Sequence, residues 1–343
     1  MNSTVFSTRK EDDMLVTLAD IARETGTSIS AVSAALKGNR STAKVSEETR
    51  RRVIEEAKRL GYRPSHAARS LKSGRTGIFG FITSEIKTPY YGEIASILMA
   101  EADQYEYSVL INATGGNPER QLRTFNRLRD GRCDGLILLD GELLENYPSI
   151  VDSLIKNAFP IVLINNPRPE FSSVNEDWDV GFGAAAHYLR ERGMTDAVFF
   201  GYRVECRERT KLQALLRACT GAGISLRFVE SGRSLEQAEK YGRSLAESSN
   251  RPRVIFTESD VVAMPLMKGL HDAGVRIPED IGVIGCDDMM LRKFNVPSLA
   301  TIGFDKVLLG KQVIATLFAI LDKRSEVVET INLPTAFIQG ESI

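Results

Sequence analysis

The spacing of hydrophobic residues changes near residue 76, and this change divides the chain into two parts. Between residues 17 and 63, apolar residues recur at helical spacing, which predicts three short helices. After residue 76, short continuous apolar runs alternate with amphipathic stretches of helical spacing. Strands that are apolar throughout are typical of parallel sheets covered by helices on both faces. The pattern therefore predicts a small helical unit followed by a larger α/β region.

The expected strands of the larger region are short and rich in β-branched residues. They are 78–82, 108–112, 135–139, 161–164, 197–200, 254–257 and 281–286. Helices are expected between them, for example at 91–106, 181–192 and 261–273. This number of units is enough for two doubly wound α/β subdomains. Ligand sites in such sheets lie at the carboxyl ends of the strands.

Each helix of the small unit has a recognisable start. Thr17, Ser28 and Ser46 are suited to cap helices that run to about residues 24, 36 and 60. Gly26 permits a tight turn between the first two helices. Two helices joined in this way form a helix–turn–helix, which places its second helix in the major groove of DNA. The residues expected to face outward at the start of that helix are Ile29, Ser30, Ser33 and Ala34.

The charge distribution supports DNA binding, although the formal net charge of the whole chain is only −1. Between Thr17 and Arg75, thirteen Lys and Arg residues stand against six Asp and Glu residues. The remainder of the chain has 31 basic and 39 acidic residues. A basic unit joined to an acidic body attracts phosphates at one end. Surface lysines are also common on small helical domains, so the asymmetry alone favours DNA only modestly.

A short basic segment, residues 64–76, joins the two parts. Pro64 stops the third helix, and Ser65 can cap a fourth helix of about two turns, which is too short to be stable alone. Leu71 is a large apolar residue on this segment. It either packs on the neighbouring domain or wedges between bases in the minor groove, and its chemistry favours neither alternative.

The N-terminal sequence resembles the lactose/galactose-repressor (LacI/GalR) family. The resemblance rests on Thr17–Ala22, Gly26, Ser28, Val32–Ser33, Val45–Ser46, Thr49–Arg50, Leu60–Pro64 and Ala67–Leu71. It implies that the second helix reads the major groove, that the hinge helix folds on the operator, and that Leu71 intercalates. The residues that it places at the DNA are Thr17, Ser28, Ile29, Ser30, Ser33, Ala34, Arg50, Tyr62, Ser65, Ala68, Arg69, Leu71 and Lys72.

The expected recognition helix departs from the family pattern at two positions. Ala31 stands where the family usually has Thr, and Ala34 stands where many members have Arg. An Arg can make a bidentate contact to guanine, which Ala cannot. We therefore expect an atypical operator, read by Ser30 and Ser33 and by apolar contact from Ile29. On this interpretation Ala34→Arg shifts the preferred half-site.

The resemblance continues nearly to the C-terminus, through stretches such as Asp134–Ile137, Ile277–Asp288 and Pro297–Ile302. It implies a periplasmic-binding-protein-like fold with a ligand cleft between two subdomains. It also implies a homodimer on a palindromic operator and a sugar-like effector. The residues that it places at the effector are Tyr90, Tyr91, Thr114, Lys211, Asp260, Asp287 and Phe304.

Three of these positions leave alternatives open. Asp287 ends a buried strand, so it either accepts hydrogen bonds from a ligand or pairs with a base such as Lys211. Lys211 aligns with a ligand-binding Arg of the family, but a shift of two residues would put Arg209 there. Ser259 and Phe304 replace an Asn and a Gln of the family, which removes polar contacts. The ligand is then less hydroxylated than a sugar, or the pocket serves a partner protein.

Nothing in the sequence supports catalysis, a metal site or a membrane span. The three His residues show no metal-ligand spacing, the four Cys residues form no CxxC pair, and Gly115–Gly116 is no phosphate-binding loop. No apolar run reaches about 18 residues, and residues 1–16 lack the apolar core of a signal peptide. We expect a cytoplasmic protein that is not an enzyme and needs no cofactor.

The predicted organisation has four parts. They are a disordered leader (1–16), a helix–turn–helix domain (17–63), a hinge (64–76) and an effector-binding and dimerisation domain (77–343), whose subdomains are about 77–175 plus 306–343, and 176–305. The predicted function is a dimeric, effector-responsive transcription regulator, most simply a repressor. One alternative is a regulator controlled by a partner protein through a degenerate cleft. The other is a solute-binding protein without a role at DNA.

Overall fold

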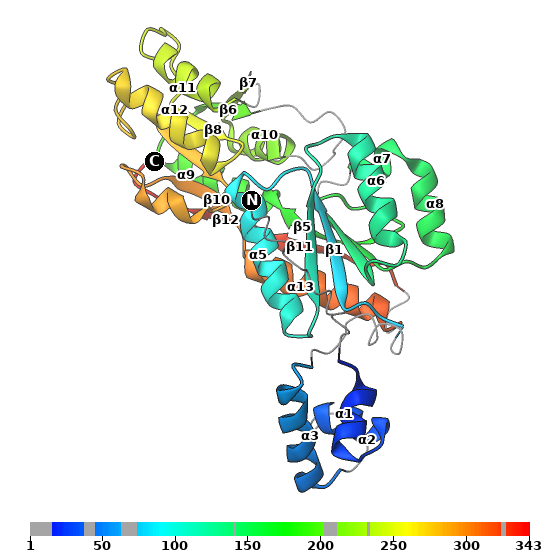
Figure 1. Ribbon diagram of the computed structural model, residues 1–343. Coiled ribbons are helices and arrows are strands. Elements are labelled where there is room, and N and C mark those ends of the chain that lie inside the picture. Colours follow the sequence, from blue (N-terminus) through cyan, green and yellow to red (C-terminus); the bar gives the residue numbers. More distant parts are fainter. Residues whose placement is uncertain are drawn as a thin grey trace, which may run out of the picture. The chain divides into compact units, whose positions relative to one another are not determined.

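The computed structural model describes residues 16–37, 45–62, 74–139, 142–201, 211–231, 234–323 and 327–343. They form two compact units, one up to Arg75 and one from Thr76 onward, both drawn in Figure 1. No helix in these ranges is long and apolar enough to cross a membrane.

The small unit is built from three described helices: α1 (Leu18–Thr25), α2 (Ile29–Lys37) and α3 (Glu47–Arg59). Their apolar faces meet in one core, as the helical spacing predicts. The buried members of that core are Ile21, Ala22, Val32, Ala35, Val53 and Ala57.

The predicted starts of α1 and α2 are confirmed. Thr17 and Asp20 form a reciprocal cap, in which the side chain of each accepts a hydrogen bond from the amide of the other. Ser28 Oγ accepts a hydrogen bond of 3.1 Å from the amide of Ala31. Gly26 has a φ of +60°, a conformation that glycine adopts without steric cost, and so the chain turns between the two helices.

The first subdomain of the large unit is a six-stranded parallel sheet in the order β11-β5-β4-β3-β1-β2. Its strands are β1 (Ile78–Thr83), β2 (Ser108–Ala113), β3 (Gly135–Leu139), β4 (Ile161–Ile164), β5 (Ser172–Asp177) and β11 (Thr330–Pro334). One face packs against α5 (Pro89–Asp103) and α13 (Lys306–Leu321), and the other against α6 (Pro118–Arg129), α7 (Glu142–Asn146) and α8 (Pro148–Lys156), as Figure 1 shows.

The second subdomain has a six-stranded sheet in the order β12-β10-β9-β8-β6-β7. Its strands are β6 (Asp196–Gly201), β7 (Ser225–Glu230), β8 (Val254–Thr257), β9 (Gly282–Cys286), β10 (Ala300–Gly303) and β12 (Ala336–Ile338), the last antiparallel to β10. Helices α9 (Trp178–Glu191) and α10 (Lys211–Ala222) cover one face, and α11 (Leu235–Ser244) and α12 (Asp260–Asp272) the other. A 3₁₀ helix, η2 (Met290–Phe294), follows β9.

All seven predicted strands are present, and their ends differ from the prediction by at most one residue. The described strands β5, β7, β10, β11 and β12 were not predicted. Strand β5 has the sequence SSVNED and β7 has SLRFVE, so neither contains the continuous apolar run that identified the others. Such strands form because their residues pack within the sheet, and the hydrophobic pattern of the sequence does not reveal this packing.

The predicted subdomain boundary is wrong at the C-terminus. The sequence predicts that residues 306–343 belong to the first subdomain, but β12 pairs with β10 in the second sheet. Ile343 packs against the core of the second subdomain as well. The reason is that the chain crosses back after β11, and pairing between strands far apart in sequence leaves no local signal.

The described chain passes between the two subdomains after β5, after β10 and after β11. Thr335, which is 2% exposed, ties the first and third crossovers together. Its hydroxyl donates a hydrogen bond of 2.7 Å to the carbonyl of Asp177 and accepts one of 3.1 Å from the amide of Gly181. The three crossings place the ends of strands from both sheets close to one another.

Candidate functional site

The start of α2 presents an accessible surface, as expected of a recognition helix. Ile29 is 53% exposed, which is unusual for a large apolar side chain on a small helical unit. Ser30 is exposed and its hydroxyl lies 2.9 Å from that of Ser28, while Ser33 is half-buried. We call these four residues, Ser28, Ile29, Ser30 and Ser33, the α2 surface.

Ala34 does not belong to the α2 surface, contrary to the expectation from helical spacing. It is only 4% exposed. Helical spacing places Ala34 one turn beyond Ser30 on the same side of α2. Whether that turn is exposed depends on how the other parts of the small unit pack. The shift in half-site preference expected for Ala34→Arg therefore stays a prediction, since the alanine that it replaces is covered.

The remaining residues expected at DNA have other surroundings or lie outside the described ranges. Thr17 caps α1, and Tyr62 packs against the core of the small unit. The guanidinium of Arg50 lies 3.9 Å from the carboxylate of Glu47 on the same helix. Outside the described residues lie Ser65, Ala68, Arg69, Leu71 and Lys72, and with them the expected hinge helix.

In the large unit, side chains from both subdomains meet at the crossovers. The first subdomain contributes residues from the start of α5 and the ends of β4 and β5. The second contributes residues from the starts of α9 and α10 and the end of β9. We call this set the crossover cluster: Tyr90, Asn165, Glu176, Trp178, Lys211 and Asp287.

The part of the crossover cluster from the first subdomain is linked by hydrogen bonds. Tyr90 Oη donates to Glu176 Oε1 at 2.7 Å and accepts from Asn165 Nδ2 at 3.1 Å. The amide of Glu176 donates to Asn165 Oδ1 at 3.1 Å. Asn165 has a φ of +60°, a conformation that asparagine tolerates. Tyr90, one of the residues expected at the effector, is therefore held in a fixed orientation.

The part from the second subdomain centres on an ion pair between Lys211 and Asp287. Lys211 Nζ lies 2.5 Å from Asp287 Oδ1 and 2.8 Å from the carbonyl oxygen of Glu258. It also lies 4.5 Å from the ring centroid of Trp178, within the range of a cation–π contact. Of the two alternatives that the sequence leaves open for Asp287, the structure shows the pairing with Lys211, whereas Arg209 lies outside the described residues.

Burial and charge act against each other at this ion pair. Burial by itself lowers the pKa of the Lys211 ammonium, but the negative neighbours, Asp287 foremost, outweigh it and raise this pKa above its ordinary value. Burial raises the pKa of Glu176 from 4.5 to about 7, although the attraction of Lys211 opposes the rise. Lys211 therefore stays charged, and Glu176 changes its charge near neutral pH.

The raised pKa of Glu176 predicts how the stability of the large unit depends on pH. A carboxyl that binds its proton more tightly when folded stabilises the fold fully below about pH 4.5, and this contribution is lost as the pH rises through about 7. Glu176→Gln is expected to reduce the change in unfolding free energy between pH 5 and pH 8 by about 2 kcal/mol. This is less than the whole pKa shift corresponds to, because the carboxyl is only half-buried and water screens it. Urea unfolding at pH 5, 6, 7 and 8 measures it. Equal pH slopes in the two proteins would contradict the prediction.

Aromatic rings continue the crossover cluster from one subdomain to the other. Phe304 is buried, and its ring centroid lies 6.5 Å from that of Tyr90 and 6.4 Å from that of Trp178. Tyr91 packs edge-on against Tyr90 with a centroid distance of 5.3 Å. Phe304 thus occupies the middle of an aromatic series, where the family pattern has a polar residue.

Two residues expected at the effector use their polar atoms within the fold. The hydroxyl of Thr114, 1% exposed, donates to the carbonyl of Thr83 at 3.1 Å. Asp260 is fully buried and accepts hydrogen bonds from Thr301 Oγ1 at 2.6 Å and from the amide of Met289 at 2.7 Å. Burial raises the pKa of Asp260 to about 7. Both residues hold loops in place, and so they stabilise the cluster without being part of it.

Sequence reasoning missed Glu176, the acidic residue of the cluster from the first subdomain. It lies at the carboxyl end of β5, where the rule for ligand sites in parallel sheets would have pointed to it. The polar sequence of β5 concealed the strand and therefore its end. Among the described residues, no group of three His, Cys, Asp or Glu side chains is arranged to hold a metal ion.

Comparison with known proteins agrees with this architecture. The family pattern "Bacterial regulatory proteins, lacI family" matches residues 17–65, and the pattern "Periplasmic binding protein-like domain" matches residues 186–343. The ribose operon repressor of Haemophilus influenzae is 30% identical over 342 residues, which covers 96% of this chain and 99% of that relative. Catabolite control protein A of Priestia megaterium is 29% identical over 296 residues, 84% of this chain and 87% of the relative.

The fold is also found in solved structures. The lac repressor dimer bound to operator and the anti-inducer ONPF superimposes with a TM-score of 0.81, at 20% identity, over 96% of this chain and 99% of that one. A helix–turn–helix unit followed by a periplasmic-binding-protein-like body defines a DNA-binding transcription regulator, not an enzyme. The chain belongs to the lacI family of bacterial regulatory proteins.

Proposed function

We propose that the protein is a cytoplasmic, dimeric repressor that binds a pseudo-palindromic operator through the α2 surface and responds to a small metabolite. The metabolite binds at the crossover cluster. The observation that carries the proposal is that charged and aromatic side chains of both subdomains meet there, in a chain that also has a helix–turn–helix. A ligand at such a point contacts both subdomains and can change the angle between them.

The chemistry of the crossover cluster favours a ring-shaped ligand with hydrogen-bond donors. The rings of Tyr90, Phe304 and Trp178 make this part of the cluster aromatic, although each is at most 9% exposed in the single chain. The carboxyl groups of Glu176 and Asp287 accept hydrogen bonds from hydroxyl or amino groups. One relative is named as a ribose operon repressor, and we propose a sugar or a related metabolite for this chain too.

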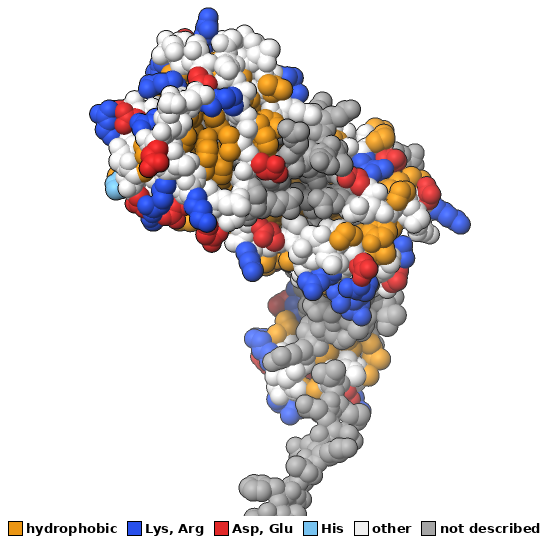
Figure 2. All heavy atoms as spheres, turned by 90° about the horizontal axis from the view of Figure 1, so that it is seen from above, with side chains coloured by type: hydrophobic (Ala, Val, Ile, Leu, Met, Phe, Trp, Pro, Cys, Tyr) orange, Lys and Arg blue, Asp and Glu red, His pale blue; other side chains and the backbone are white. Residues whose placement is uncertain are grey.

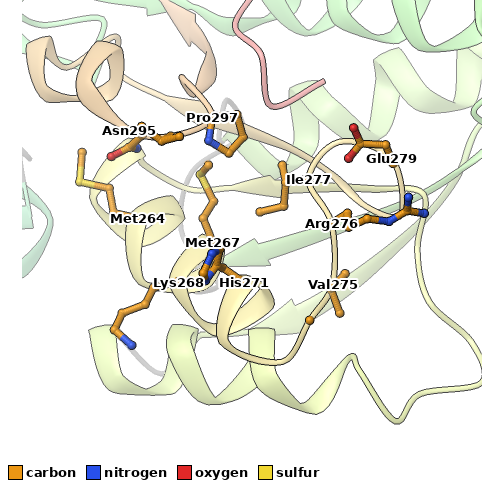
Figure 3. A pocket seen from close by; sticks show the side chains of 12 residues that line it. Met264, Met267, Lys268, His271, Val275, Arg276, Ile277, Glu279, Asn295 and Pro297 are labelled. Carbon is orange, nitrogen blue, oxygen red and sulfur yellow. The ribbon is translucent and has the colours of Figure 1, made fainter.

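Dimerisation has a candidate surface on the second subdomain. A hollow of about 590 Å³ lies between α12 and residues 295–297. Figure 3 shows Met267 and Ile277 reaching into the space between α12 and the segment with Asn295 and Pro297. The lining is largely apolar, with Lys268 and Arg276 among its polar members.

Exposed apolar side chains continue from this hollow along η2. Val296 is 94% exposed, Phe294 75% and Met290 65%. Figure 2 shows that hydrophobic side chains gather between charged ones on the large unit. Contiguous apolar surface of this kind is typical of a protein interface. We call α12, residues 295–297 and η2 the self-association surface and propose that a second copy covers it.

A two-fold dimer matches the expected operator. An interface in which the same patch of each copy meets its counterpart gives two-fold symmetry. Such symmetry presents two α2 surfaces to two half-sites of opposite orientation. The symmetry of the protein therefore predicts a pseudo-palindromic operator.

Selection of binding sites from randomised duplex DNA tests the proposed function. The protein is expected to enrich an inverted repeat, and its affinity is expected to fall steeply with salt because bound phosphates release counterions. A screen for thermal stabilisation by monosaccharides and nucleosides then tests the effector site. A solute-binding protein would enrich no sequence. Enrichment of an operator without any stabilising metabolite would favour control by a partner protein.

The exposed Ile29 is expected to read one base pair in each half-site. Ile29→Ala is expected to relax the preference at that position and to weaken operator binding about 5- to 30-fold, because the apolar contact to a thymine methyl group is lost. The same selection with the variant measures it. Ile86→Ala, at an isoleucine of the large unit that is 46% exposed, is the matched control. An unaltered preference in Ile29→Ala would contradict this role.

A further inference from the structure

The residue that follows Asp287 takes part in an unusual turn. Asp287 has a φ of +91° and Asp288 a φ of +45°, so two successive residues other than glycine lie in the left-handed region. Such conformations are uncommon and persist where surrounding contacts enforce them. The turn directly follows β9 and carries the carboxylate that pairs with Lys211. Its contacts therefore decide where the carboxylate of Asp287 lies.

Most of the contacts that enforce this turn come from the second subdomain itself. The amide of Asp287 donates to the carbonyl of Ile302 at 2.8 Å. The carboxylate of Asp288 accepts a hydrogen bond of 2.5 Å from Nε of Arg292, which is 5% exposed and belongs to η2. These contacts hold the turn against its own sheet and the beginning of the self-association surface.

One contact comes from the other subdomain. Lys306 is the first residue of α13, and its Nζ donates a hydrogen bond of 2.9 Å to the carbonyl oxygen of Asp288. The same ammonium forms an ion pair with Glu93 of α5. Only 10% of the Lys306 side chain is exposed. The ammonium is therefore held in a nearly buried position between α5, α13 and the turn.

The two helices on the Lys306 side, α5 and α13, are closely packed. A Cβ on Gly310 of α13 would lie 2.4 Å from Ile97 of α5, so glycine is needed for this approach. Helix α5 also carries Tyr90, which is hydrogen-bonded to Glu176. One turn separates Tyr90 from Glu93, so the helix that presents Tyr90 to the cluster is also the helix that holds Lys306.

We infer that Lys306 is an interdomain latch, a positioning residue that ties the Asp287–Asp288 turn to α5 and α13 and so fixes the angle between the subdomains. A ligand that draws Asp287 away from Lys211 moves the adjacent carbonyl of Asp288. The contact of that carbonyl with Lys306 then changes, and the first subdomain is displaced. The role of Lys306 in regulation rests on the proposed function, whereas its role in fixing the angle between the subdomains does not.

The latch is tested in the full chain by comparing Lys306→Met with Lys306→Arg. Lys306→Met removes both contacts, while Lys306→Arg keeps a cation that can reach the carbonyl of Asp288. Lys311→Met, at an exposed lysine of the same helix, is the matched control. Glu93→Gln is a second variant, which weakens only the ion pair with Lys306. It is therefore expected to fold even if Lys306→Met does not.

Two measurements distinguish a latch from a merely structural lysine. In Lys306→Met, amide hydrogen exchange at residues 287–289 is expected to be roughly tenfold faster, the effect of losing one hydrogen bond to an ammonium. The distance between spin labels at Asp152 on α8 and Lys240 on α11 is expected to become broader. Lys306→Arg should restore both measurements and Lys311→Met should alter neither. Glu93→Gln should shift both in the same direction by less.

Wild-type exchange and an unchanged label distance in Lys306→Met would overturn the latch. Operator affinity is measured in parallel and is expected to change at least about 5-fold in Lys306→Met, a typical coupling between sites. Absence of any operator preference in the wild-type protein would contradict the proposed function instead. The two failures are therefore distinguishable.

Discussion

Lys211→Met is expected to lower the free energy of unfolding of the large unit by about 3–5 kcal/mol, the usual cost of removing one partner from a buried ion pair. The variant leaves the carboxylate of Asp287, which is 5% exposed, without its cation. It also removes the charge that opposes the raised pKa of Glu176. Both effects disfavour the folded state at neutral pH.

Urea unfolding followed by tryptophan fluorescence measures this loss. Trp178 is the only tryptophan of the chain, and its ring lies against the Lys211 ammonium, so its emission reports directly on the site. The double variant Lys211→Met/Asp287→Leu is expected to recover most of the stability, since apolar residues often replace a buried ion pair without loss.

A surface ion pair provides the control for the buried one. Arg123 forms an ion pair with Glu119 on α6, away from the self-association surface, and both side chains are well exposed. Arg123→Met is expected to cost less than about 1 kcal/mol, as exposed pairs contribute little. A loss in Lys211→Met that is no larger than the loss in Arg123→Met would show that the ion pair of the cluster does not stabilise the fold.

The double variant Phe294→Glu/Val296→Glu is expected to dissociate the dimer and to weaken operator binding about 10²- to 10⁴-fold. Both side chains are largely exposed in the single chain, so the fold is expected to tolerate the change. Four carboxylates placed in an apolar two-fold interface repel one another and lose water. A monomer binds only one half-site, so it lacks the added affinity that a dimer gains by binding both half-sites at once.

Sedimentation analysis and operator affinity at one salt concentration measure the two effects. Val327→Glu/Val328→Glu is the matched control, since it adds the same charge at exposed valines of the first subdomain. This control measures how much operator affinity is lost only because added carboxylates repel DNA phosphates. A variant of the self-association surface that remains dimeric would show that the dimer forms elsewhere.

Local chemistry was enough to predict the small unit and most of the larger sheets. A cap depends on neighbours within three residues, and Thr17 and Ser28 both cap as predicted. Strands such as 135–139 and 254–257 are continuous apolar runs and were predicted with their observed ends. For Asp287 the sequence left two alternatives open, a ligand or a base such as Lys211, because a buried carboxylate needs a partner.

Features that depend on distant parts of the chain were not predicted. Ala34 has the spacing of an exposed residue but is covered. Strand β12 joins the second sheet because the chain crosses back after β11. Glu176 becomes part of the crossover cluster only when β5 lies beside β4, and its own sequence context is polar.

The sequence by itself determined the small helix–turn–helix unit, the two doubly wound subdomains and membership of the family, because helix caps, turns and apolar runs act over a few residues. Only the tertiary structure decided that Lys211 is held by Asp287 against Trp178, that Tyr90 is held by Glu176, and that Lys306 joins the two subdomains. Each of these contacts spans more than fifteen residues of sequence. Their geometry arises from three crossings of the chain, which no local pattern contains.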